Sequence, residues 1–296
     1  MKSSLSAESR SNLGLYYGMY ILAMLIFGTN GILVSKISLQ GSQIVLFRTL
    51  IGGLMLTLLV LFRGGFDLPS VKAEFPPLLL GGVALGLNWV ALFTAYRLLN
   101  VSLATLIYYA GPMLVLLFSP VLFHEPLSRT KIAAVAIVAV GLICISGSIA
   151  SGGLNMAGLA AAAVSALFYA SLIVFNKRIT RTSGLQTAAI ELDIAFAVVL
   201  IYTLLVTGLP HPVHGDIPWL LILGLVNTGL AYLLYFSGLQ KLPAQSVALI
   251  SYVDPVSALV FSFLLLHESL TAVQWIGAVL IIGGAILGEL KKTSQE

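Results

Sequence analysis

Residues 118–128 read FSPVLFHEPLS, and residues 261–271 read FSFLLLHESLT. The two stretches lie 143 residues apart, and each stands where a long apolar run ends. Aligned without gaps at this offset, Leu106–Leu127 and Leu249–Leu270 share eleven of 22 residues. The shared residues include a proline, a histidine and a glutamate, which are uncommon types in this chain. The chain therefore contains an internal duplication.

The duplication extends upstream of these stretches. Gly81 matches Gly224 at the same offset. Near the start of each half the offset slips by two residues, so that FGTNGILVSK (27–36) aligns with FYASLIVFNK (168–177). We therefore expect two repeats, at residues 13–148 and 149–290, between terminal tails at residues 1–12 and 291–296.

The composition indicates that lipid surrounds the apolar runs. Charged residues make up 9% of the 296 residues, against about 25% in ordinary soluble domains. Apolar residues make up 59%, and the mean hydropathy is +1.04. The net charge of +4 does not indicate nucleic-acid binding, because the basic residues are dispersed between the apolar runs. The single cysteine excludes an intrachain disulfide.

The apolar runs predict an all-α membrane protein. A helix needs about 20 apolar residues to cross the hydrocarbon core, and ten runs reach roughly this length. A membrane β-barrel is excluded, because its strands alternate apolar and polar residues and these runs do not. The ten transmembrane helices are expected at residues 14–36, 42–62, 75–98, 101–123, 130–147, 156–178, 185–207, 216–239, 244–267 and 271–290.

The basic residues predict the orientation of these helices. With the N-terminus inside, the inner segments hold twelve of the fifteen Lys and Arg residues, which is the bias of cytoplasmic loops. We therefore expect both termini in the cytoplasm. Because each repeat has five helices, an odd number, the second repeat is inverted relative to the first. Inverted repeats suit alternating access, in which a central site is exposed to each side in turn.

The whole chain resembles the drug/metabolite transporter superfamily, specifically its ten-helix EamA type, over about residues 14–290. The residues that carry the resemblance are Pro112…Glu125-Pro-Leu, Pro255…Glu268-Ser-Leu, Gly28, Lys36 and Arg48. The resemblance implies a multi-pass secondary transporter of a prokaryotic inner (plasma) membrane, more often an exporter. It also implies that the first four helices of each half surround the substrate path and that the fifth is peripheral.

Ionisable residues inside a span are costly and are functional candidates by default. We predict that Arg48, Glu191 and Asp254 bind substrate or couple transport. Arg48 and Glu191 are repeat equivalents, and the alternative is an ion pair that holds the halves together. Asp193 lies about 200° from Glu191 around a helix, so the two cannot face the same path, and we favour Glu191. Asp254 precedes Pro255, which frees a backbone carbonyl, and irregular backbone at this depth lies inside protein or beside a wet cavity.

Amides and aromatic rings within the spans form a second group of candidates. The amides either join helices or contact substrate, and the rings either pack together or line a pocket. Two pairs, Trp89 with Tyr232 and Tyr109 with Tyr252, are repeat equivalents, which favours a shared cavity. The second group consists of Asn30, Asn88, Trp89, Tyr109, Asn227, Tyr232 and Tyr252.

Glu125 and Glu268 end the fourth helix of each repeat, at opposite membrane faces. Each carboxylate either stabilises the turn before the next helix or acts in a gate. The first reading is supported by Thr271-Ala-Val-Gln274, which matches a capping box. We expect no metal site, because His124 and His267 lie at opposite faces, and no cofactor.

These observations predict a secondary-active transporter, not an enzyme, that exports a small metabolite such as an amino acid or amine by alternating access. The sequence has no G-x-x-x-x-G-K-[ST] loop, so we expect a substrate or proton gradient rather than ATP to drive it. The expected partners are the substrate, the lipid bilayer and a proton, without nucleic acid; the oligomeric state is left open.

Four alternatives remain. A facilitator or exchanger and a drug exporter would share the fold. An intramembrane enzyme would need His, Asp, Glu or Ser clustered at one depth, and a receptor would need larger segments outside the membrane. Neither of these two classes explains an inverted duplication.

Overall fold

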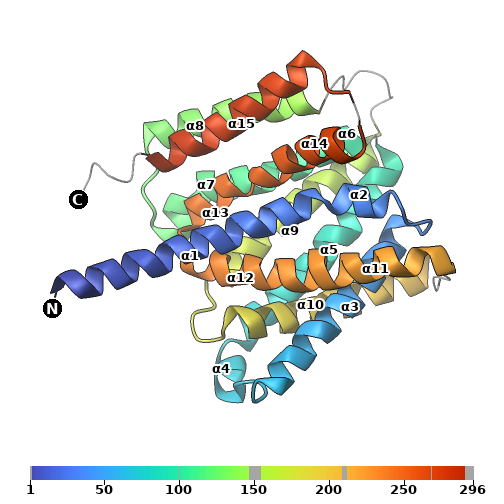
Figure 1. Cartoon of the computed structure of the whole chain (residues 1–296), viewed down its shortest axis with the longest axis horizontal. Coiled ribbons are helices and arrows are strands. Elements are labelled where there is room, and N and C mark those ends of the chain that lie inside the picture. The colour runs from blue at the N-terminus through green and yellow to red at the C-terminus, as the bar shows by residue number, and fades with distance from the viewer. Residues whose placement is uncertain (1, 100, 147–154, 209–211, 268, 291–296) are drawn as a thin grey trace.

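The computed structural model describes residues 2–99, 101–146, 155–208, 212–267 and 269–290. All regular structure in these ranges is helical, which confirms the predicted all-α class (Figure 1). Nine segments among them are long and apolar enough to cross a membrane. Glu268, the expected repeat boundary at 148/149 and the tail at 291–296 lie outside the described residues.

The helices follow one another through short connections. In chain order they are α1 (Lys2–Gly28), α2 (Asn30–Val34), α3 (Gly41–Phe62), α4 (Leu68–Ala73), α5 (Phe75–Leu98), α6 (Val101–Tyr108), α7 (Ala110–Phe123), α8 (Arg129–Ile145), α9 (Met156–Asn176), α10 (Gly184–Val206), the short 3-10 helix η2 (His214–Asp216), α11 (Ile217–Gly224), the π-helix η3 (Leu225–Leu230), α12 (Ala231–Lys241), α13 (Ala244–Ile250), α14 (Val253–Leu265) and α15 (Ala272–Leu290).

The spans cross one bundle, so their connections alternate between its two ends. Helix α4 lies at one end and α2 at the other, and we call these the α4 end and the α2 end (Figure 1). Helix α1 begins at Lys2, so residues 2–12, expected as a tail, are helical, and this part extends beyond the bundle (Figure 1).

Four of the expected spans are interrupted rather than continuous α-helices. The first breaks at Thr29, whose hydroxyl donates to the carbonyl of Ile26 at 2.7 Å. Such local side-chain bonds compete with the helical ladder. The eighth contains η3, a π-helix that is a rare element and is frequent at functional sites.

The other two interruptions are repeat equivalents and lie upstream of prolines. Helix α6 gives way to α7 at Tyr109, before Pro112, and α13 gives way to α14 before Pro255. A proline lacks the N–H that the carbonyl four residues earlier would accept. The Tyr252 hydroxyl donates to the carbonyl of Tyr109 at 3.0 Å, so the two breaks contact each other.

The fifth helices of the repeats, α8 and α15, pack against each other at one side of the bundle (Figure 1). Their contact follows the repeat symmetry. A Cβ added at Gly141 would lie 2.7 Å from Ile281, and one added at the equivalent Gly284 would lie 2.9 Å from the equivalent Val138. Glycine permits this close approach in both directions.

Side-chain caps begin several helices where the sequence places hydroxyl or amide residues. The capping box expected at Thr271 is confirmed: its N–H donates to the Gln274 side chain at 2.9 Å, and the N–H of Gln274 donates back at 3.3 Å. The hydroxyl groups of Ser128 and Ser183 cap α8 and α10 by accepting the N–H groups of Lys131 and Gln186. These caps satisfy backbone donors that a helix start leaves free.

Glu74, at the start of α5, holds the connection between α9 and α10. Its carboxylate accepts backbone N–H groups of Thr180 at 2.7 Å, Arg181 at 2.9 Å and Thr182 at 2.8 Å, and two threonine hydroxyls. Burial alone would raise the pKa of Glu74, but these hydrogen bonds outweigh it and lower the pKa to about 2. The carboxylate thus joins the first repeat to the second at the α4 end.

Because the folded-state pKa of Glu74 is depressed, its charge stabilises the fold above the usual carboxyl pKa of about 4.3. This contribution is lost as the pH falls toward the folded value. We expect Glu74→Gln to lower the stability at neutral pH by about 1.5–3 kcal/mol, the range for hydrogen bonds to a charged group. The difference from wild type should shrink between about pH 5 and pH 3. Thermal unfolding in detergent across this range measures it, and a pH-independent difference would contradict the assignment.

Candidate functional site

A cavity of about 490 Å³ lies between the repeats and reaches toward the α2 end. This volume falls in the range of small-molecule sites. Its lining comes from every interrupted span and from α3, α5 and α9. The lining residues are Met24, Phe27, Gly28, Asn30, Gly31, Val34, Arg48, Leu85, Asn88, Trp89, Leu92, Phe93, Tyr96, Val101, Thr105, Tyr108, Tyr109, Tyr169, Leu172, Tyr232, Tyr235, Asp254 and Ala258.

Repeat-equivalent aromatic residues meet at this cavity. The rings of Trp89 and Tyr232 pack edge to face with centroids 5.7 Å apart, and those of Tyr109 and Tyr252 lie 6.4 Å apart. Trp89, Tyr109 and Tyr232 line the cavity, whereas Tyr252 lies behind Tyr109. Three of the four paired residues therefore line one cavity, and Tyr252 does not.

Arg48, on α3, supplies the positive charge of the cavity. Its Nε donates to the Thr228 hydroxyl at 2.9 Å, and one terminal nitrogen donates to the Asn227 carbonyl at 3.2 Å. The guanidinium carbon lies 5.3 Å from the centre of the Trp89 ring, within cation–π range. Arg48 is 7% exposed. Its guanidinium group lies between the π-helix, to which it donates hydrogen bonds, and the indole ring of Trp89.

Asp254, in the first turn of α14, supplies the negative charge. The Tyr109 hydroxyl donates to its carboxylate at 3.0 Å. A carboxylate near a helix N-terminus is favoured by the helix dipole. Asp254 and Arg48 line the same cavity and are close enough to interact electrostatically. The cavity therefore holds one basic and one acidic side chain within an aromatic wall.

Asn227 connects the π-helix to the break in the first span. Its side-chain nitrogen donates to the Ile26 carbonyl at 2.8 Å and to the Thr29 hydroxyl at 2.7 Å, and it also lies 3.2 Å from the Asn30 amide oxygen. Asn30 itself lines the cavity, whereas Asn227 lies just outside it. This amide therefore bonds two interrupted helices to each other beside Arg48.

Glu191 lies outside the cavity. It is fully buried on α10, where both carboxylate oxygens accept the Asn176 side-chain nitrogen, at 2.9 and 3.0 Å. It fills the space over Gly81, where a Cβ would collide with it. Arg48 bonds to the eighth span instead, so among the described residues the alternative of an Arg48–Glu191 ion pair is not found. As expected, Asp193 faces the opposite way, toward Thr57 at 2.6 Å.

Two further candidates have clear contacts. Asn88 lines the cavity, and its amide nitrogen donates to the Ser165 carbonyl at 2.8 Å, so it also joins α5 to α9. The Glu125 carboxylate accepts two backbone N–H groups at the start of α13, far along the bundle from the cavity mouth. The Asn88 contact is of the helix-joining kind expected for it. The Glu125 carboxylate instead contacts α13, a helix of the other repeat, rather than the turn before α8 that it was expected to stabilise.

Several cavity residues were not singled out from the sequence. Tyr96 and Tyr169 are examples, and each lies on a span whose inward face the sequence does not define. The Tyr235 hydroxyl is buried and has no partner in hydrogen-bond geometry, although the Tyr20 and Tyr169 hydroxyls lie nearby. A buried hydroxyl without a partner is unusual, and this one belongs to a side chain that lines the cavity.

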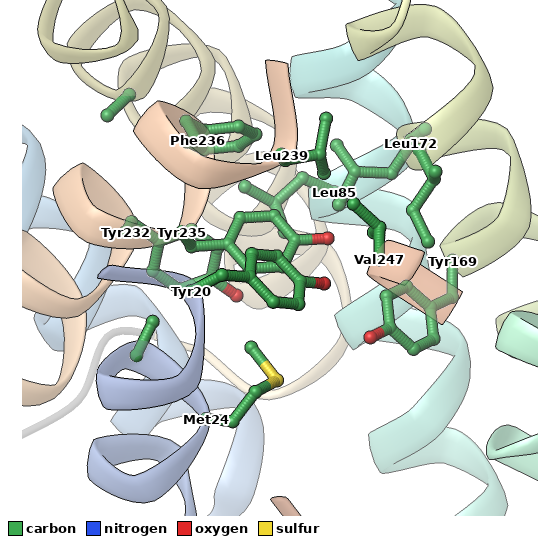
Figure 2. Packing of buried hydrophobic residues seen from close by; sticks show 14 of the residues in the cluster. Tyr20, Met24, Leu85, Tyr169, Leu172, Tyr232, Tyr235, Phe236, Leu239 and Val247 are labelled. Carbon is green, nitrogen blue, oxygen red and sulfur yellow. The ribbon is translucent and has the colours of Figure 1, made fainter. Parts of the chain in front are cut away.

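Buried side chains from both repeats pack together, and Figure 2 shows Tyr20, Leu85 and Val247 among them. Along their helices, Tyr20, Leu239 and Val247 lie on the α4 side of the cavity lining. We call Tyr20, Leu85, Leu172, Leu239 and Val247 the closing layer; each is at most 3% exposed. The Tyr20 hydroxyl is paired with Ser251 at 2.9 Å. The cavity is thus accessible from the α2 end and sealed from the α4 end.

The site offers no arrangement for a metal ion. Within the part of the chain that the structure describes, there is no group of three or more His, Cys, Asp or Glu residues that could hold one. The polar groups at the cavity are instead suited to a ligand that carries its own charges.

The sequence model of the EamA-like transporter family matches residues 14–147 and 156–288. The chain is 27% identical over 281 residues to the uncharacterized transporter YxxF of Bacillus subtilis (strain 168), covering 93% of this chain and 89% of that protein. It is 28% identical over 246 residues to the protein PecM of Dickeya dadantii (strain 3937), covering 82% and 80%. A crystal structure with 22% identity shares the fold, with a TM-score of 0.82 over 93% of this chain and 97% of that one. The chain belongs to the EamA-like transporter family of membrane proteins.

Proposed function

We propose that this transporter exports a small zwitterionic or amine-bearing metabolite, such as an amino acid, through the central cavity. The observation that carries the proposal is that Arg48 and Asp254 line the same aromatic-walled cavity. Arg48 suits a carboxylate and Asp254 suits an ammonium group. Aromatic rings suit an apolar side chain or a cationic group over their faces.

The proposal includes ten spans with both termini in the cytoplasm of a prokaryotic cell. Helix α8, with 17 residues, is the segment that completes the ten. At 1.5 Å per residue it is about 26 Å long, close to the hydrocarbon thickness of about 30 Å, and it packs along α15. The repeats are then residues 13–148 and 149–290, and the α4 end faces the cytoplasm. On this assignment the structure is outward-facing.

The proposed mechanism is alternating access between the repeats. The pairs that meet near the cavity are repeat equivalents, so an inward-facing form can arise when the halves exchange their conformations. Asp254, the acidic cavity residue, is the candidate for proton coupling. A facilitator or exchanger would use the same cavity without a proton gradient, and a drug exporter would accept larger apolar cations.

The test begins with purified protein in a thermal-shift screen against amino acids, amines and cationic drugs. A ligand that binds the folded state raises the unfolding temperature. Each hit then goes to flux measurements in liposomes, with and without an imposed pH gradient. Flux that needs the gradient supports coupling through a proton, flux that ignores it supports the facilitator, and absence of any flux would sink the proposed function.

We expect Asp254→Asn to abolish flux of the hit while leaving a folded protein, because the cavity loses its negative charge. Glu191→Gln is the matched control, since Glu191 is a buried carboxylate outside the cavity. A glutamine there can exchange reciprocal amide hydrogen bonds with Asn176, whose oxygen lacks a partner. Glu191→Gln should therefore keep near-normal flux. Full flux in Asp254→Asn, or equal losses in both variants, would remove Asp254 from the mechanism.

We expect Arg48→Gln to weaken binding of an amino acid by at least about tenfold, the cost of losing one charged hydrogen-bonded partner. The amine that lacks only the carboxylate should bind the variant and the wild type alike. Thermal-shift titrations of both ligands against both proteins form a double-mutant cycle. If Arg48→Gln weakens the binding of both ligands equally, Arg48 stabilises the helix packing and does not bind the substrate carboxylate.

A further inference from the structure

The helices that surround the cavity pack as two groups, and each group draws on both repeats. Helix α9 packs on α5, α6 and α7, and we call these four helices the α9 group. Helix α1 packs on α12, α13 and α14. Together with α2, α11 and η3, which complete the first and eighth spans, we call these the α1 group. Helices α3 and α10 contact members of both groups. The units that can move against each other are therefore these groups rather than the repeats themselves.

A carboxylate fastens each group internally. Glu74, before α5, accepts the backbone of Thr180 and Thr182 after α9, all in the α9 group. Asp216, before α11, accepts the Ser38 N–H at 2.9 Å and its hydroxyl at 2.7 Å, which joins the eighth span to the first in the α1 group. The two carboxylates stand at corresponding places in the two repeats, at opposite ends of the bundle.

A third carboxylate joins the two groups to each other. Glu125, after α7, accepts the backbone N–H of Ala244 at 2.8 Å and of Gln245 at 3.0 Å, at the start of α13. The Gln245 side chain returns to the α9 group, donating to the Ser119 hydroxyl at 2.6 Å and to the Glu125 carbonyl at 3.1 Å. Lys131 also contacts the Gln245 side chain. We call Glu125 and Gln245, with these bonds, the latch.

A left-handed backbone turn at His124 positions Glu125. His124 ends α7 with φ 56°, in the left-handed region, which a residue other than glycine seldom adopts. Its repeat equivalent His267 has φ 54°. The same turn thus follows the fourth helix of each repeat, and in the first repeat it delivers Glu125 to α13.

The latch lies at the closed end of the cavity. Helices α7 and α13 pack against each other beside the closing layer, whereas their equivalents at the α2 end, α14 and α6, have no comparable packing. For the cavity to open toward the α4 end, α13 must separate from α7. Every bond of the latch crosses that boundary, so every one of them must break.

We propose that Glu125 and Gln245 latch the gate at the α4 end and bias the protein toward the outward-facing form. This role deepens the proposed transport function and rests on it. Removing a latch bond raises the free energy of the closed form and leaves the open form, in which the bond is already broken, unchanged. The inward-facing population must then rise.

The test is an accessibility measurement that needs no substrate. A reporter cysteine replaces Val247 of the closing layer (Val247→Cys), in a background where the native Cys144 is serine. A membrane-impermeant maleimide is applied to the cytoplasmic face of oriented vesicles. Glu125→Gln places an amide NH₂ where two N–H donors need an acceptor. It should raise the labelling rate at position 247 at least about tenfold, as expected from the loss of charge-assisted hydrogen bonds.

Glu74→Gln is the matched control. It removes a carboxylate that also accepts backbone N–H groups at the α4 end, but within one group. It should lower the unfolding temperature and leave the labelling rate unchanged. Gln245→Leu, which removes the returning bonds, carries the test if Glu125→Gln fails to insert. Wild-type labelling rates in the latch variants, or an equal rise in Glu74→Gln, would overturn the latch.

Labelling and flux separate the two proposals. Raised labelling in a protein that moves no metabolite would keep the latch as a gate of this fold and reject the proposed transport. Normal flux together with unchanged labelling in the latch variants would keep transport and reject the latch.

Discussion

Inside a bilayer, each backbone N–H and C=O group that leaves a helical ladder must find a partner within the protein. This constraint explains where the chain is irregular. All four irregular segments lie beside one cavity, so each has protein rather than only lipid around it. They are the break at Thr29, the π-helix at Leu225–Leu230 and the two proline breaks. Carbonyl groups at these irregular points accept side-chain donors: the Tyr109 carbonyl accepts the Tyr252 hydroxyl, and the Asn227 carbonyl accepts Arg48. The irregular backbone and the polar site are thus one feature.

The duplication supplies symmetric packing, and a few substitutions make the site chemically asymmetric. Gly141 on Ile281 mirrors Gly284 on Val138, and Trp89 meets its own equivalent Tyr232. The charges do not follow this rule. Arg48 faces the cavity, whereas its equivalent Glu191 is buried against Asn176. Asp254 stands where the first repeat has Gly111, which instead lets α7 approach α9 closely. The basic side chain of the cavity therefore comes from one repeat and the acidic side chain from the other.

Much of this arrangement could be predicted from the sequence, because lipid imposes strong rules. The apolar runs predicted most helix ends within a few residues, and Pro255 predicted a break that the structure has. The repeat-equivalent pairs pointed to Trp89, Tyr109 and Tyr232, which line one cavity. The sequence could not show which face of each span turns inward, because the spans are apolar all round, and so Tyr96 and Tyr169 were missed. It also could not show the break at Thr29 or the π-helix, which have no proline and depend on tertiary contacts such as those of Asn227.

The central claim is that one cavity opens to the two membrane faces in turn as the α9 group moves against the α1 group. Pulsed electron paramagnetic resonance on lipid-reconstituted protein, with Cys144 replaced, tests it directly. One spin-label pair at Val101 and Leu264 reports on the α2 end, and another at Leu122 and Lys241 reports on the α4 end; all four side chains are exposed. The account predicts two populations in which a shorter distance at one end accompanies a longer distance at the other. Distances that lengthen together at both ends, or a single distance at each end under every condition, would contradict it.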